Sequence, residues 1–271
     1  MKTLNTPAVH CRERISTLSG KTVRRPGLKL WAVAIWIGIW FAVSSLLGEE
    51  IILASPWQVI LRLYELVQQA DYWKRVGFSC ARVMGGMLAG MALGVVLGTL
   101  AHFKKWFRDF LSPFIAFIRA IPVVSFIILA LYMLTGDVLS CFITFIICFP
   151  VFYSNTVAGL AAADEKLLEM ARFFKISLFK RLYAIYLPVL LGHLLSACEV
   201  AVGLAWKSGV AAEYIAIPAA SIGRRLYDAK INLKSADMLA WTVTIVLLSA
   251  FFSWLIRLVL RQAVQKWGAG E

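Results

Sequence analysis

Charged residues are scarce in this sequence of 271 residues. Only 16% of the residues are charged and 61% are hydrophobic, whereas an average soluble domain has roughly 25% and 45–50%. A soluble protein of this length could not bury so much apolar surface, and the same composition excludes intrinsic disorder. A lipid bilayer is the solvent that suits the chain, and each spanning helix needs about 20 residues. The length therefore allows several spans but no large soluble catalytic domain.

The residues that build metal and redox sites are also few. Three histidines lie far apart, and the five cysteines contain no CxxC pair: Cys11, Cys80, Cys141, Cys148 and Cys198. This scatter argues against a zinc site, a disulfide framework or a redox motif, and predicts small buried apolar residues instead. A membrane-embedded enzyme would need clustered His or Asp at the span ends. We therefore predict no metal, no cofactor and no enzymatic activity in this chain.

Long apolar runs bounded by charged residues predict an all-α, polytopic membrane protein with six transmembrane helices. The predicted spans are residues 30–47, 83–101, 110–134, 138–160, 182–205 and 238–260. The polar segment before the first span is longer than the n-region of a signal peptide, so we expect the first helix to be retained. The expected parts are a basic N-terminal segment (1–29), a six-helix transmembrane domain (30–262) and a tail (263–271).

The net positive charge lies almost entirely on one predicted side of the membrane. The net charge is +13, from 28 Lys and Arg against 15 Asp and Glu. With the N-terminus placed in the cytoplasm, the predicted cytoplasmic segments carry +12 and the opposite segments carry +1. This is the pattern of the positive-inside rule, so both termini are predicted to be cytoplasmic. Because topology explains the charge, no nucleic-acid partner is expected.

The second predicted span carries four glycines at a spacing of four: Gly86, Gly90, Gly94 and Gly98. In a soluble helix each would cost about 1 kcal/mol, whereas in a membrane a stripe of small residues lets two helices approach closely. The stripe could join helices of one subunit or of two subunits. Packing within one subunit is the favoured interpretation.

The segment 161–188, between the fourth and fifth spans, resembles the EAA loop of ABC importer permeases. The family pattern is Glu-Ala-Ala-x3-Gly-x9-Ile-x-Leu-Pro, and five residues match at the correct spacing: Glu169, Ala171, Ile185, Leu187 and Pro188. Met170 replaces an Ala. Lys175 replaces the Gly that normally serves the turn between two short helices, so that turn is open to question here. By its apolar spacing alone, the segment could also be a helix that lies on the lipid surface.

Further motifs extend the resemblance over about residues 30–262 and place it in the nitrate/sulfonate/taurine/bicarbonate branch of these permeases. They are Ser55-Pro56, Ser79-x2-Arg82-Val83-x2-Gly86, Arg119-Ala-Ile-Pro122, Ala205-Trp206 and Ala212-Glu213. The resemblance implies a type I ABC importer permease (MetI-like) fold in a bacterial inner membrane. It also implies two permease subunits, expected to be a homodimer embedded in membrane lipid, together with an ABC ATPase subunit and an extracytoplasmic solute-binding protein.

The resemblance further implies that the EAA loop docks into the ATPase and transmits its closure to the permease. The residues expected to couple the subunits are Glu169, Ala171, Phe174, Lys175, Ser177, Ile185, Leu187 and Pro188. The chain contains no P-loop of the form GxxxxGK[ST], so ATP hydrolysis must reside on a partner subunit.

Charges, prolines and polar residues in or near the spans are the candidates for the translocation pathway. These are Arg119, Pro122, Ser125, Glu199, Trp206 and Glu213. A charge within a membrane is costly and indicates function by default. Arg119 suits an anion path, and Glu199 stands where related permeases tend to carry Arg. An Arg119–Glu199 ion pair and a direct contact with the substrate both remain open. His193 is expected to be a packed residue.

The predicted function is that of the transmembrane permease subunit of an ABC importer for a small solute such as nitrate, a sulfonate or taurine. The alternative is a proton-coupled secondary transporter or channel, in which Glu199 and His193 would relay protons. The EAA-like loop favours the importer, because a proton-coupled carrier has no reason to keep it. An interfacial helix within 49–82 and a binding-protein contact within 214–236 are expected on the outside.

Overall fold

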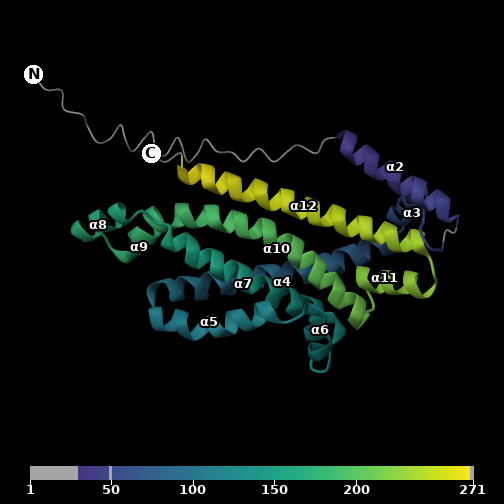
Figure 1. The fold of residues 1–271 in the computed structure, drawn as a ribbon. Coiled ribbons are helices and arrows are strands. Elements are labelled where there is room, and N and C mark those ends of the chain that lie inside the picture. Colours follow the sequence, from purple (N-terminus) through teal and green to yellow (C-terminus); the bar gives the residue numbers. More distant parts are fainter. Residues whose placement is uncertain (1–29, 49–50, 269–271) are drawn as a thin grey trace, which may run out of the picture. The chain divides into compact units, whose positions relative to one another are not determined.

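A computed structural model describes residues 30–48 and 51–268, which form helices joined by short loops (Figure 1). No β-strand occurs in these two ranges. The predicted basic segment 1–29 lies outside the described residues, as do residues 269–271 of the predicted tail. The chain divides into two units, Met1–Gly48 and Glu49–Glu271. The first contributes helix α2 (Leu30–Leu47), which coincides with the first predicted span.

Four helical segments of the second unit are long and apolar enough to cross a membrane. They are α4 (Ala70–Phe103), α7 (Gly136–Ala161), the segment Leu178–Ala216 that ends in α10 (Leu187–Ala216), and α12 (Ser235–Gly268). They correspond to the second, fourth, fifth and sixth predicted spans. Three predicted bounds are wrong, since α4 begins well before residue 83, α10 continues past residue 205 and α12 continues past residue 260. The apolar runs marked only the parts of these helices where charged side chains are rare.

The third predicted span, 110–134, is not one continuous helix. It consists of α5 (Lys105–Ala120) and α6 (Val123–Leu131), which meet at an angle of 97°. Pro122 lies at the break, and proline disfavours helical geometry in the residue before it. Ile121 accordingly has an extended backbone, with φ −70° and ψ 129°. The all-α fold is confirmed, but the described residues hold four spanning helices, or five if α5 and α6 form one bent span, besides the shorter apolar helix in α2.

Shorter helices lie at the two ends of the second unit (Figure 1). One end carries α3 (Pro56–Val67) and α11 (Ile222–Ile231), and the other carries α8 (Glu165–Phe173) and α9 (Leu178–Arg181). The helix expected within 49–82 is α3. Ser55 caps it and exchanges hydrogen bonds with Gln58, the third helical residue, in a capping box.

The glycine stripe of α4 faces α7 of the same chain. A Cβ atom on Gly86 would lie 2.2 Å from the carbonyl oxygen of Cys141, and one on Gly94 would lie 2.7 Å from Cβ of Phe152. Gly90 and Gly98 are equally close to α7. The two backbones can touch only because these positions lack a side chain. Packing within one subunit, the favoured interpretation of the stripe, is confirmed.

Replacing Gly86 by Ala is expected to destabilise the protein by about 1–3 kcal/mol, because the new methyl group would collide with the backbone of α7. Gly77→Ala is the matched control, since Gly77 lies on the same helix with no atom within 4 Å of an added Cβ. The melting temperatures of the two purified variants in one detergent test this. A Gly86→Ala protein as stable as Gly77→Ala would contradict the close contact.

Candidate functional site

Helix α8 exposes an apolar surface at one end of the second unit. Asp164 caps the helix and accepts a hydrogen bond from the Lys166 amide at 2.9 Å. Ala171 is the buried residue of the helix and only 2% of it is exposed. On the other sides Phe173 is 82% exposed and Phe174 is 67% exposed. The helix thus packs internally through Ala171 and the partly buried Leu168, and its C-terminal end presents two aromatic rings to its surroundings.

The turn after α8 has the geometry that glycine usually supplies. Lys175 has a φ of +51°, in the left-handed region. Its amide donates to Arg172 at 3.0 Å, and the next amide, Ile176, donates to the carbonyl of Ala171 at 2.9 Å. These two bonds define a Schellman motif, which most often ends in Gly. Lys175 therefore replaces the expected Gly and keeps a Gly-type turn, at a conformational cost of about 1 kcal/mol.

A π-helical turn, η1 (Leu182–Tyr186), joins the short helix α9 to α10. Pro188 is the second residue after it and has no N–H to donate to the preceding turn. Such turns are inserted locally into α-helices and are frequent at functional sites. Of the other predicted coupling residues, Ser177 precedes α9, Ile185 lies within η1 and Leu187 begins α10. Glu169 is exposed on α8.

At the opposite end, a buried carboxylate ties α10 to α4 and α11. Glu213 is fully buried, and its Oε2 accepts hydrogen bonds from Ser79 Oγ at 2.7 Å and from the Gly223 amide at 3.3 Å. Ser79 Oγ in turn accepts the Ile222 amide at 3.0 Å. The carboxylate and the hydroxyl thereby satisfy two amides at the start of α11, which have no partner inside that helix.

Arg82 extends this network. Its guanidinium lies 3.6 Å from Glu213 Oε1, and it donates to the carbonyl of Ala220 at 2.8 Å and to Asp137 at 2.5 Å. One side chain of α4 therefore holds α7, α10 and the loop before α11 together. A buried charge needs such compensation, because desolvation would otherwise cost several kcal/mol.

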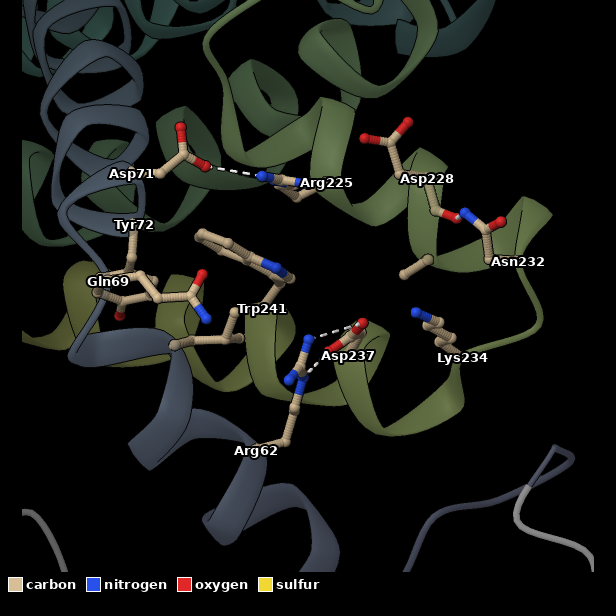
Figure 2. A pocket seen from close by; sticks show the side chains of 12 residues that line it. Arg62, Gln69, Asp71, Tyr72, Arg225, Asp228, Asn232, Lys234, Asp237 and Trp241 are labelled. Atoms are coloured by element: carbon tan, nitrogen blue, oxygen red, sulfur yellow. Dashed lines mark hydrogen bonds and ion pairs between the residues drawn. The ribbon is translucent and has the colours of Figure 1, made fainter.

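A polar pocket of about 160 Å³ lies at the same end, between α3, α4, α11 and α12 (Figure 2). The rings of Tyr72 and Trp241 line it, 5.0 Å apart. Ion pairs stand on two sides of these rings: Arg225 with Asp71 at 2.7 Å, and Arg62 with Asp237. Charges of both signs face the pocket, but the two arginines are already neutralised by carboxylates.

The predicted pathway residues divide into exposed and buried groups. Arg119, Pro122 and Ser125 are exposed around the break between α5 and α6. Trp206 and Glu213 are buried, and the Trp206 ring packs 5.8 Å from Phe252. Neither the Trp206 nor the Glu213 side chain reaches the surface of the chain.

Arg119 and Glu199 have different neighbours, contrary to one of the two open interpretations. Arg119 donates to the carbonyl of Pro150 at 3.0 Å and to Ser154 Oγ. Glu199 lies 3.8 Å from Arg257 of α12. Arg119 of α5 therefore contacts α7, and Glu199 of α10 contacts α12. His193 packs against Gly159, as expected for a structural residue.

Several residues of these sites escaped the sequence analysis. Arg82 and Ser79 belonged to a recognised motif, but their partner Glu213 stands more than 130 residues later in the chain. The pairs Arg62–Asp237 and Arg225–Asp71 join equally distant segments. No local pattern indicates such pairings, because they depend on which helices become neighbours.

Replacing Lys175 by Gly is expected to stabilise the turn after α8 by up to about 1 kcal/mol, because Gly adopts a positive φ without strain. Lys175→Val should weaken it, since a β-branched residue suits this geometry poorly. Hydrogen exchange of the Ile176 amide, which closes the turn, measures both effects. Equal protection in all three proteins would show that Lys175 does not carry the strain.

Comparison with known proteins agrees with this architecture. The family model described as "Binding-protein-dependent transport system inner membrane component" matches residues 90–265. The putative aliphatic sulfonates transport permease protein SsuC of Bacillus subtilis is 26% identical over 254 residues, which cover 90% of this chain and 91% of that protein.

Two further relatives have related names. The nitrate import permease protein NrtB of Synechocystis sp. is 26% identical over 225 residues, 79% of this chain and 80% of its own length. The taurine transport system permease protein TauC of Escherichia coli is 22% identical over 200 residues, 71% and 73% of the two chains.

These relatives are transporter components rather than enzymes, and the family works with an ATPase and a binding protein. The alternative function, a proton-coupled secondary transporter or channel, does not agree with this family or with these relatives. Because the family model covers well over half of the chain, the protein belongs to the binding-protein-dependent transport system inner membrane components and is a multi-pass permease subunit of an ABC import system.

Proposed function

We propose that this permease imports a small solute that bears an oxyanion group and that a partner ATPase drives it through α8. The relatives named for sulfonate, taurine, nitrate and bicarbonate transport support this solute class. The observation that carries the coupling role is the exposed aromatic tip of α8, formed by Phe173 and Phe174, within the EAA-like loop. An apolar helix surface of this kind fits a hydrophobic groove on a partner.

The proposed orientation places α8 and α9 in the cytoplasm, with both termini on the same side. The net charge of the predicted cytoplasmic segments, +12 against +1 for the opposite segments, supports it. The end with α3 and α11 then faces the binding protein, so the pocket of Figure 2 lies on the receiving side. We further propose that two copies of the chain form the pathway, as the resemblance to type I importers implies.

Removing the aromatic tip is expected to uncouple transport while the permease stays folded. Phe173 and Phe174 are exposed, so replacing both by Ala costs little internal packing, yet it removes the apolar anchors. Uptake should fall at least tenfold in proteoliposomes that contain the partner ATPase and binding protein. Glu169→Lys, at another exposed position of α8, should act in the same direction.

The control for this experiment is Phe251→Ala on α12, which removes a half-exposed ring far from α8 in the sequence. It should transport normally. Full uptake by the Phe173→Ala, Phe174→Ala protein, with unchanged ATPase binding, would disprove the coupling role of α8.

Arg119 is the proposed contact for the oxyanion. It is exposed beside the break between α5 and α6, and its hydrogen-bond partners are a carbonyl and a hydroxyl. Within the described residues no carboxylate forms an ion pair with it. Its positive charge therefore remains available to an anion. Glu213, by contrast, is proposed to hold the helices together and not to meet the solute.

Variants of Arg119 and Glu213 should separate these two roles. Arg119→Gln is expected to lower oxyanion uptake about tenfold or more, equivalent to about 1.4 kcal/mol, without changing the melting temperature. Glu213→Gln is expected to lower stability by about 1–3 kcal/mol, because it weakens the bonds to Ser79 and Gly223. Uptake assays and melting curves of both variants measure this. Normal uptake with Arg119→Gln would remove it from the pathway.

A further inference from the structure

A second polar cavity, of about 320 Å³, lies beside α8, at the end of the second unit that also carries α9. Three nitrogen-bearing side chains line it from three elements: His102 near the end of α4, Arg172 in the last turn of α8 and Arg181 in α9. A single water needs only about 10–15 Å³ by the same measure, so the cavity has room for a much larger group.

The charges of this cavity have one sign. The remaining lining residues are Phe103, Leu178, Leu182 and Tyr186, and none of the seven carries a carboxylate. Neither Arg172 nor Arg181 forms an ion pair within residues 30–48 and 51–268. The pocket of Figure 2 differs in this respect, because its Arg62 and Arg225 are each paired with an aspartate. Among the residues that the structure describes, no carboxylate therefore compensates the positive charge beside α8.

Arg181 also has an unsatisfied donor. Its Nε is shielded from solvent and has no hydrogen-bond acceptor in the described part of the chain. A buried polar group without a partner costs about 1–3 kcal/mol, and more when the group is charged. An anion in the cavity would accept this hydrogen bond and pair with both guanidinium groups, which bind phosphate oxygens in a bidentate manner.

The cavity lies where two membrane-spanning segments end. Helix α4 ends at Phe103, and the segment Leu178–Ala216 begins at Leu178. Both residues line the cavity, so it lies at the end of both segments. Basic pockets at such places bind the head groups of anionic lipids, and the apolar side chains of Phe103 and Leu182 suit the adjoining acyl chain.

We propose that this cavity binds a phosphate group, between Arg172 and Arg181, and so links the end of α4 to the docking helices α8 and α9. The phosphate chemistry is common to the head group of an anionic lipid and to free inorganic phosphate. The argument for a lipid rests on the cytoplasmic orientation proposed above for the α8 end, but the site does not depend on the solute and is separate from Arg119.

Binding to the full-length permease in nanodiscs of neutral phosphatidylcholine tests the proposal. One arm adds phosphatidylglycerol and the other adds inorganic phosphate, and native mass spectrometry and melting temperature report binding. In Arg172→Gln, Arg181→Gln the affinity should fall at least tenfold. The matched control, Lys166→Gln, Lys180→Gln, removes the same charge from exposed positions of α8 and α9 that do not line the cavity, and should change affinity less than twofold.

Saturable binding of phosphatidylglycerol alone identifies the lipid head group as the ligand, and binding of inorganic phosphate identifies the free anion. Equal losses in both double variants, or no loss in either, would overturn the site, since binding would then be non-specific or elsewhere. If the pocket double variant does not fold, Arg172→Gln alone decides the question, because Arg172 is exposed on α8. Transport assays play no part in this test, so its outcome is independent of the proposed function.

Discussion

The contact between α4 and α7 is the constraint on which the other features of the second unit depend. Glycines at four successive turns bring the two backbones into contact, and α10 packs against the same pair through Gly209, close to Val83 and Thr144. Because α4 is long, its two ends reach both functional regions of the unit: Ser79 and Arg82 near one end, and His102 at the other. A change in the position of α4 against α7 would therefore act on both.

The two ends of the second unit differ in how their arginine side chains are paired. At the end with α11, Arg82 lies beside Glu213 and the pairs Arg62–Asp237 and Arg225–Asp71 flank Tyr72 and Trp241, so each of these arginines has a carboxylate partner. At the end with α8, aromatic rings are exposed and Arg181 keeps an unused donor. Glu213 Oε1 is also buried without a hydrogen-bond partner among the described residues, so the contrast between the two ends lies in the pairing of their arginines.

Sequence reasoning was accurate where one physical property has a fixed period or a local signature. Apolar runs located α2, α4, α7, α10 and α12, and the EAA-like pattern located α8 and the turn at Lys175. It failed where a long apolar run hid a break: Ile121-Pro122 separates two helices at 97°, although both are apolar. It also shortened α4 and α10, because charged side chains that pair inside the protein look like loop residues in a linear sequence.

The sequence by itself determined that this chain is a helical membrane permease with an EAA-like loop, because hydropathy and a spaced motif are local properties. Only the tertiary structure decided which charges meet. In the folded chain Arg119 contacts α7, and Glu199 lies near Arg257. Glu213 is buried and bonded to Ser79, and Arg172 and Arg181 line one cavity. The physical reason is that an ion pair or an anion site depends on distances of a few ångströms between helices, which no linear spacing records.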